Sequence, residues 1–202
     1  MIAGLLLAAG RSSRFGSDKL CASIRGEAVI RSSFGALAEL DEVLVIVPPD
    51  DAAIRNALAG TPSRFVSNAQ RDSGMASSIR AGVQAAPVEA DAVVIALADQ
   101  PYARADVTRM LVQRWSAGGA DIVAPQYTDG RGHPVLFARR CFDALAQLEG
   151  DDGARGLMSD GRFSFATVSM PFAMPLDVDT PELLALAAER ATHDASISPP
   201  SA

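Results

Sequence analysis

Short apolar runs alternate with amphipathic segments from the first residue to Trp115. Three apolar runs have the length of buried strands, Ile2–Ala8, Val43–Val47 and Val93–Leu97, and Ser63–Ser67 is predicted as a further short strand. Between and after them, helices are predicted over 28–40, 50–58 and 73–85, and around Val107, Leu111 and Trp115. This alternation predicts an α/β fold in three layers, with a mostly parallel sheet and a functional site beyond the carboxyl ends of its strands.

The pattern loosens after Asp121. Further strands are predicted at Ile122–Pro125, Pro134–Phe137 and Arg162–Ser169, and a helix over 138–147. A threonine, a proline and a glutamate at 180–182 have the order of a helix start, so a final helix should run to about Ala191. Residues 1–191 are therefore expected to form one domain, and the serine- and proline-rich residues 192–202 a disordered tail.

Composition restricts the class of protein. The chain has 202 residues, 49% hydrophobic and 21% charged, which suits one globular domain. A net charge of −6 argues against a nucleic-acid or membrane surface, so a bound anion must be met by local cations. Arginines directly follow the apolar N-terminus, which favours a first strand in a cytoplasmic protein over a signal peptide. Cys21 and Cys141 form neither a disulfide framework nor a metal spacing.

A loop with the composition of a polyphosphate site follows the first strand. It contains glycines, serines, Arg11, Arg14 and Lys19, and Lys19 is the only lysine in the chain. An ammonium is a compact charge that can lie between several phosphate oxygens. The Walker motif is absent because Leu20 follows the lysine, and the dinucleotide fingerprint lacks its middle glycine. We interpret the loop as a triphosphate clamp that uses Arg14 and Lys19, while Arg11 could instead be a solvated loop residue.

Three aspartates occupy positions suited to a metal. Asp99 lies two residues after the end of the Val93–Leu97 strand, and Asp177 and Asp179 precede the final helix. Magnesium binds proteins through one or two carboxylates together with phosphate oxygens and water. The residues alone leave a second interpretation open for each of the three, as a turn or helix-capping acid.

Residues 7–19 read LAAGRSSRFGSDK and resemble the signature L-A-A-G-x-S-x-R-F/M-G-x-x-K of nucleotidyltransferases with a MobA-like domain. Five later segments narrow the resemblance to the molybdenum cofactor cytidylyltransferases. They are GMASSIRAG at 74–82, LADQP at 97–101, GRGHPVLF at 130–137, GDDGAR at 150–155 and DVDTPE at 177–182. The resemblance implies a Rossmann-like nucleotidyltransferase domain that uses Mg²⁺ to transfer CMP from CTP to the terminal phosphate of molybdenum-molybdopterin, releasing pyrophosphate.

The resemblance also implies roles for individual residues. Arg14, Lys19 and Asp99 would be catalytic, and Asp99 and Asp179 would hold the metal, with Asp177 the alternative second acid. Nucleotide contacts fall on Leu7, Ala8, Ala9, Gly10, Arg14, Lys19, Asn68, Gly74, Ser77 and Ser78. Acceptor contacts fall on His133, Asp151 and Arg155. Without the resemblance, residues 68–78 could form an ordinary helix cap. Residue 133 and residues 151–155 could lie in solvated loops.

Two alternatives remain open in the sequence. A related enzyme of the same fold could act on a sugar or polyol phosphate, and a non-catalytic carrier could pass cofactor to a molybdenum hydroxylase or its chaperone. A carrier needs no metal-triphosphate site, so the combination of Lys19, Asp99 and Asp179 favours an enzyme. The L-A-A-G sequence, where guanylyl-transferring relatives have L-A-G-G, predicts CTP rather than GTP as the substrate.

Overall fold

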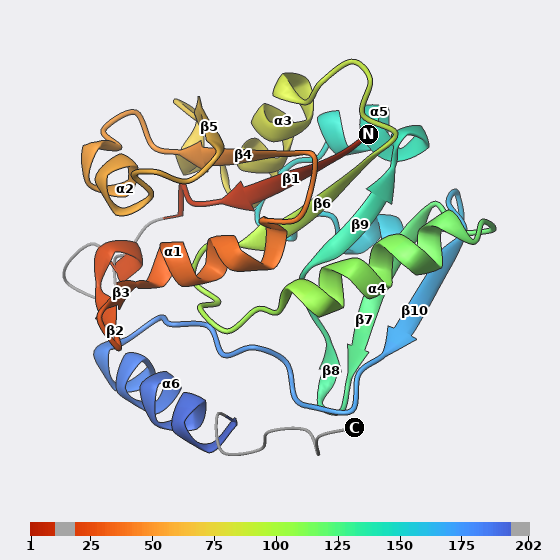
Figure 1. Ribbon diagram of the computed structural model, residues 1–202. Helices are drawn as coiled ribbons and strands as arrows, with labels where there is room; N and C mark the ends of the chain where they lie inside the picture. The colour runs from red at the N-terminus through yellow and green to blue at the C-terminus, as the bar shows by residue number, and fades with distance from the viewer. Residues whose placement is uncertain (11–18, 195–202) are drawn as a thin grey trace.

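The central feature of the fold is a twisted sheet with helices on both faces (Figure 1). The computed structural model describes residues 1–10 and 19–194. The sheet has the strand order β10-β7-β9-β6-β1-β4-β5, and β8 pairs with β7. Its strands are β1 (Ile2–Leu7), β4 (Glu42–Val47), β5 (Ser63–Ser67), β6 (Ala92–Leu97), β7 (Ile122–Tyr127), β8 (Gly130–Arg131), β9 (Val135–Ala138) and β10 (Phe165–Ser169).

Most strand pairs are parallel. The central strand β1 is parallel to β4 and β6, β5 is parallel to β4, and β10 is parallel to β7. The short strand β9 is the exception, because it lies antiparallel between β6 and β7. The carboxyl ends of β1, β4 and β6 therefore meet at one edge of the sheet, where functional groups of such folds gather.

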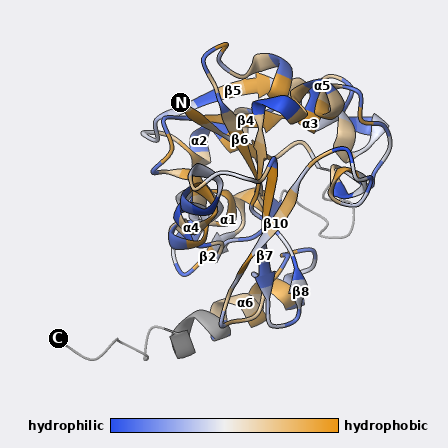
Figure 2. Cartoon of the chain, turned by 90° about the vertical axis from the view of Figure 1, so that its right-hand side faces the viewer, coloured by the Kyte–Doolittle hydropathy of each residue, from blue (hydrophilic) through white to orange (hydrophobic). Residues whose placement is uncertain are grey.

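Helices cover both faces because the inner strands are apolar at nearly every position. On one face Leu5 and Leu44 pack with Ile79 and Val83 of α3 (Met75–Ala85) and with α5 (Phe142–Ala146). On the other face Leu6 packs with α1 (Val29–Phe34), α2 (Ala52–Ala57) and α4 (Ala105–Ser116). Figure 2 shows the resulting separation of apolar strands inside from polar segments outside. The predicted three-layer, mostly parallel α/β class is confirmed.

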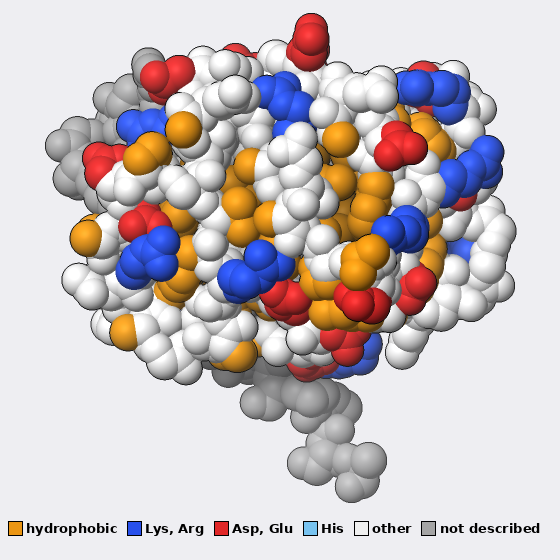
Figure 3. Space-filling view, turned by 90° about the horizontal axis from the view of Figure 1, so that it is seen from above, with side chains coloured by type: hydrophobic (Ala, Val, Ile, Leu, Met, Phe, Trp, Pro, Cys, Tyr) orange, Lys and Arg blue, Asp and Glu red, His pale blue; other side chains and the backbone are white. Residues whose placement is uncertain are grey.

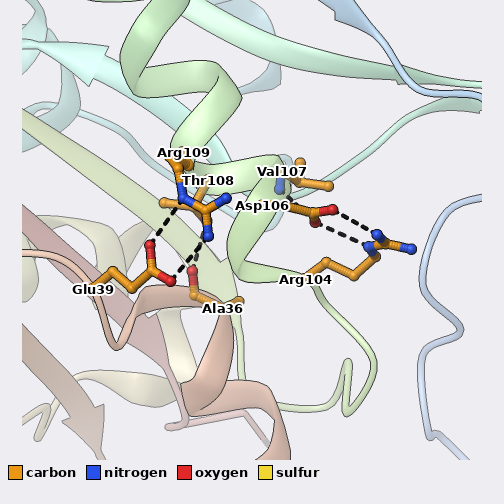
Figure 4. Close-up of polar contacts among 7 residues, drawn as sticks. All are labelled: Ala36, Glu39, Arg104, Asp106, Val107, Thr108 and Arg109. Carbon is orange, nitrogen blue, oxygen red and sulfur yellow. Dashed lines mark hydrogen bonds and ion pairs between the residues drawn. The ribbon is translucent and has the colours of Figure 1, made fainter. Parts of the chain in front are cut away.

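The start of α4 is tied to the segment that follows α1 (Figure 4). Thr108 donates its hydroxyl to the carbonyl of Ala36 at 2.7 Å, and Arg109 pairs with Glu39 at 3.0 Å. Residues 98–104 connect β6 to α4, so the buried contact of Thr108 anchors the far end of the loop that carries Asp99, whereas the Arg109–Glu39 pair is exposed and contributes little. The loop is thus held at both ends.

Several element boundaries differ from the predicted ones. The helix predicted over 28–40 ends at Phe34 and continues as a 3₁₀ turn over Gly35–Leu37, where a glycine weakens the helix. A small hairpin of β2 (Ser23–Ile24) and β3 (Glu27–Ala28) precedes this helix and was not predicted from the sequence. The final helix, α6, spans Pro181–Asp194 and so extends three residues beyond Ala191.

The outer surface carries mixed charge. On the face shown in Figure 3, basic side chains are interspersed with aspartate and glutamate, and neither sign gathers into a single patch. Within the described residues, no helix has the length and apolar character needed to cross a membrane.

Candidate active site

The backbone after β1 is held between two neighbouring strands. The amide of Ala8 donates to the carbonyl of Ile46 at 2.8 Å, and the amide of Ala98 donates to the carbonyl of Leu7 at 3.2 Å. The first residues of the glycine-rich loop therefore lie beside the start of the loop that carries Asp99. Gly10 is exposed, and a Cβ added to it would meet no atom of the described residues within 4 Å.

Ala8 and Ala9 are both 2% exposed and pack into the hydrophobic clusters on opposite faces of the sheet. The methyl group of Ala9 belongs to the cluster under α3. Any influence of Ala9 on a bound base must therefore act mainly through the position of the backbone. Arg11 and Arg14 lie outside the described residues.

A buried ammonium joins two of the predicted metal-binding acids. The Nζ atom of Lys19 lies 2.7 Å from Oδ2 of Asp99 and 2.7 Å from Oδ1 of Asp179, although these residues are 80 and 160 positions away in the chain. Lys19 is only 8% exposed. Burial disfavours its charged form, but Asp99 and Asp179 outweigh this effect and raise the pKa of Lys19, which stays protonated at neutral pH.

A small apolar cluster lies next to this ion cluster and brings its three loops together. Each of its main members is close in sequence to one charged residue: Ile24 and Val29 follow Lys19, Tyr102 follows Asp99, and Val178 precedes Asp179. The cluster is closed by residues of α6. In addition, the amide of Val178 donates to the carbonyl of Asp99 at 2.9 Å. Burial of these side chains therefore positions acids that are far apart in the sequence.

Asp177 has a different partner from Asp179. Its Oδ1 accepts a hydrogen bond of 2.8 Å from Nε2 of Gln100, a residue that is 4% exposed. Asp177 is exposed as a residue, but partial desolvation of its carboxylate raises its pKa. The nearby negative charges of Asp99 and Asp179 raise this pKa further. Nothing in the sequence pattern pointed to the contact between Gln100 and Asp177.

The acids fit a metal that also binds phosphate. Among the described residues, no group of three or more histidine, cysteine, aspartate or glutamate side chains could hold a metal ion by itself. Asp99 and Asp179, however, already share one cation. Two carboxylates supplemented by phosphate oxygens and water are a donor set that suits Mg²⁺ or Mn²⁺.

A cavity of about 630 Å³ is lined in part by Gln100 and Asp177, which lie within two residues of Asp99 and Asp179 in the chain, whereas Lys19, Asp99 and Asp179 themselves do not line it. Its wall is mainly apolar and includes Ile95, Leu97 and Phe137, and a smaller set of polar side chains completes the lining. The polar group contains the predicted acceptor residues His133, Asp151 and Arg155, together with Gln100, Arg131 and Asp177. The combination of an apolar wall and a few convergent polar groups is typical of a small-molecule site.

The residues predicted around the base form a second, buried polar group. Nδ2 of Asn68 donates to the hydroxyls of Ser77 at 2.9 Å and Ser78 at 3.1 Å, and Ser77 donates to the carbonyl of Gly74 at 2.8 Å. The three side chains are between 3% and 6% exposed. They join the end of β5 to the start of α3, so this part of the site is held rigidly by its own hydrogen bonds.

The start of α3 is capped from a distant segment. Oδ1 of Asp151 accepts a hydrogen bond from the amide of Met75 at 3.2 Å, and the carbonyl of Gly150 accepts one from Ala76 at 3.1 Å. Gly74 has φ of +89°, and a Cβ there would lie 2.5 Å from the carbonyl oxygen of Gly150. Asp151 thus caps a helix while it also lines the cavity.

His133 lies in the cavity wall, and Tyr127 donates its hydroxyl to the His133 carbonyl at 2.7 Å. Burial lowers the pKa of His133 to about 4; Arg155 lowers it further, and Asp99 opposes the change. The imidazole is therefore neutral at pH 7 and can offer one donor and one acceptor to a ligand. It cannot act there as a fixed positive charge.

This pKa predicts a specific pH dependence. A histidine protonates near pH 6.5 in the unfolded chain, so between about pH 6.5 and 4 the unfolded state binds a proton that the folded state excludes. We expect His133 to lower the free energy of unfolding by about 3 kcal/mol as the pH falls through this window, and the His133→Asn variant to lack this component.

Imidazole NMR provides the direct measurement. His133 and His193 are the two histidines of the chain, so a His193→Gln variant leaves one signal to follow. We expect this signal to remain that of a neutral ring at pH 5.5. A midpoint near 6.5 would contradict the effect of burial.

Comparisons with known proteins identify the family of the chain. Residues 4–165 match the MobA-like NTP transferase domain. The purine catabolism protein PucB of Bacillus subtilis is 30% identical over 193 residues, which are 89% of this chain and 92% of PucB. A probable molybdenum cofactor guanylyltransferase of Chloroflexus aggregans is 31% identical over 153 residues, which are 73% of this chain and 69% of that protein.

Solved structures support the same assignment. The crystal structure of Rv0371c from Mycobacterium tuberculosis has a TM-score of 0.84 and 30% identity, and the likeness covers 93% of this chain and 97% of that one. A second structure of Rv0371c is a complex with manganese. The fold and these relatives define the chain as a nucleotidyltransferase. It belongs to the family with a MobA-like NTP transferase domain.

Proposed function

We propose that the protein transfers CMP from CTP to the terminal phosphate of molybdenum-molybdopterin and releases pyrophosphate. The observation that carries the proposal is the ion cluster of Lys19, Asp99 and Asp179 beside the cavity. Carboxylates for a metal, a cation for phosphates and space for an acceptor are the parts that nucleotidyl transfer needs. The guanylyltransferase among the relatives supports a molybdenum-containing acceptor.

Each residue has a defined task in this proposal. Asp99 and Asp179 hold the metal, whose chemistry is to neutralise charge on the phosphate oxygens as it builds up. Lys19 and Arg14 bind the triphosphate. An oxygen of the acceptor phosphate forms a bond to the α-phosphorus, the bond from that phosphorus to the bridging oxygen breaks, and pyrophosphate takes the electron pair. The attacking phosphate is already anionic, so no side chain has to remove a proton.

The acceptor would occupy the cavity. Its apolar wall at Leu97 and Phe137 suits the face of a flat ring system, and Arg131 and Arg155 offer charge to an anionic acceptor. The neutral imidazole of His133 can hydrogen-bond to polar ring atoms. A sugar or polyol phosphate would make less use of the apolar wall, which is why we favour a pterin.

A carrier without catalytic activity is the competing function. Transport of a cofactor requires the cavity but gives no reason to bury a lysine between two carboxylates. An enzyme explains both features. In this proposal the product passes to a molybdenum hydroxylase or its chaperone.

The choice of base gives a direct test. We predict that the protein uses CTP in preference to GTP. We expect Ala9→Gly to reduce this preference by about ten- to a hundredfold without reversing it, because one methyl group is worth about 1–3 kcal/mol. The methyl is buried, so we expect its loss to act by relaxing the backbone next to the base.

Pyrophosphate release provides the measurement. The four triphosphates are compared in the presence and absence of molybdenum-loaded molybdopterin, with a sugar phosphate as the alternative acceptor. Preference for GTP would overturn the base assignment. Release that depends on the sugar phosphate alone would overturn the acceptor, and no release under any condition would favour the carrier.

A further inference from the structure

The ion cluster places one ammonium where a metal would be expected. Nζ of Lys19 lies 2.7 Å from one oxygen of Asp99 and 2.7 Å from one oxygen of Asp179, the acids to which we assign the metal. The side chain of Lys19 is 10% exposed, whereas those of Asp99 and Asp179 are 22% and 39% exposed. The lysine is therefore the inner partner, and the acids face the open part of the site.

We propose that Lys19 is an internal counter-ion that keeps the metal position closed until a triphosphate arrives, so that metal and nucleotide bind together and the metal alone binds weakly. The proposal rests on the proposed function only for the assignment of Asp99 and Asp179 to the metal. It adds that the same lysine serves two anions in turn, first these carboxylates and then the phosphates.

Space and charge both support this exclusion. Mg²⁺ needs its oxygen ligands at about 2.0–2.1 Å. A divalent ion between the same two carboxylates would lie within a few ångströms of the ammonium, where the two positive charges repel each other. Lys19 and the ion would therefore compete for the two acids.

The buried position of Lys19 makes a second anion necessary. The side chain is largely removed from water, so leaving the acids without a new partner would strand a buried charge. A triphosphate bound next to Lys19 would supply that partner. Transfer of Lys19 from carboxylate to phosphate would then free Asp99 and Asp179 for the metal, which is a positive coupling between two ligands.

Binding of Mn²⁺ to the nucleotide-free protein tests the exclusion, with free Mn²⁺ measured by electron paramagnetic resonance. Lys19→Met removes the ammonium and keeps a long apolar stem. Arg109→Met removes one charge from the surface of α4, where the guanidinium pairs with Glu39, and is the matched control. We expect Lys19→Met to bind Mn²⁺ about ten- to a hundredfold more tightly than wild type, within the usual range of coupling between ligands, and Arg109→Met to bind as wild type does.

Equal or weaker binding of Mn²⁺ by Lys19→Met overturns the proposal, as does an equal gain in Arg109→Met. Loss of Lys19 removes the cation that Asp99 and Asp179 share, so we expect the variant to be less stable. Circular dichroism checks its fold, and we expect Mn²⁺ to raise its melting temperature more than that of wild type.

A second measurement uses the wild-type protein. Lys19 is the only lysine of the chain, so labelling lysine with ¹⁵N at Nζ gives a single ammonium signal. We expect this signal to stay unchanged when about 1 mM Mg²⁺ is added alone. We expect it to shift when Mg²⁺ is added together with an α,β-methylene triphosphate. A full shift with Mg²⁺ alone, or no shift with both, overturns the proposal.

These experiments are independent of the proposed reaction. Neither contains an acceptor, and the analogue can carry any base. An enzyme that prefers GTP or a sugar phosphate could still show the exclusion, and a cytidylyltransferase could lack it. Failure of one conclusion is therefore distinguishable from failure of the other.

Discussion

Asp99→Asn is expected to lower kcat by at least about a thousandfold, which corresponds to roughly 4 kcal/mol of transition-state stabilisation. The carboxylate is one of two that lie 2.7 Å from Lys19 at the carboxyl edge of the sheet. Asparagine has the same shape but lacks the charge that binds a divalent ion. The measurement is steady-state pyrophosphate release at saturating Mg²⁺, with the fold checked by circular dichroism.

Two further variants sharpen this result. Asp50→Asn removes an equal charge from a side chain that is 89% exposed and should leave kcat unchanged. Asp177→Asn should lose less activity than Asp99→Asn or Asp179→Asn, because Asp177 is bonded to Gln100 and not to the lysine. Near-normal turnover of Asp99→Asn would contradict the assignment of the metal to this site. A larger loss of activity in Asp177→Asn than in Asp179→Asn would assign the second metal ligand to Asp177 instead of Asp179.

Gly74→Ala is expected to lower the free energy of unfolding by about 3 kcal/mol or more. Two costs add at this residue. Its φ of +89° is unfavourable for alanine, and the new Cβ would lie 2.5 Å from the backbone oxygen of Gly150. A backbone atom cannot move aside as the end of a flexible side chain can, so the contact between α3 and the 150–151 segment should open. Urea denaturation gives the free energy of unfolding.

Gly60→Ala is the matched control. Gly60 has a similar φ of +80°, but nothing lies within 4 Å of a Cβ at that position. Its substitution should cost only about 1 kcal/mol, which is the strain of the backbone alone. Equal effects of the two substitutions would show that the contact with Gly150 contributes little.

The hydrophobic pattern was enough to predict the inner strands β1, β4 and β6 and the edge strand β5. The predicted strands at β1, β4, β5 and β6 agree with the structure to within one residue at each end. Strands that are buried on both faces must be apolar at nearly every position, so their pattern is visible without any knowledge of their neighbours. Their alternation with helices was enough to predict parallel pairing and the edge at which the site lies.

Local signals failed where the stabilising contacts are tertiary. The hairpin of β2 and β3 has strands of only two residues each, too short to produce a periodic pattern. The antiparallel placement of β9 between β6 and β7 depends on the path of the chain around the sheet. The cap on α3 comes from Gly150 and Asp151, more than seventy residues beyond the helix start.

The site divides in the same way. Residue chemistry marked Lys19 and Asp99 as candidates, because a single lysine in a glycine-rich loop and an acid after a strand are recognisable locally, and the resemblance to the nucleotidyltransferases selected Asp179 over Asp177. Only the tertiary structure decided that the lysine binds both of these acids and that Asp177 binds Gln100. The reason is physical: these contacts join residues 77 to 160 positions apart, and burial of the apolar cluster around Tyr102 and Val178 brings them within hydrogen-bond distance.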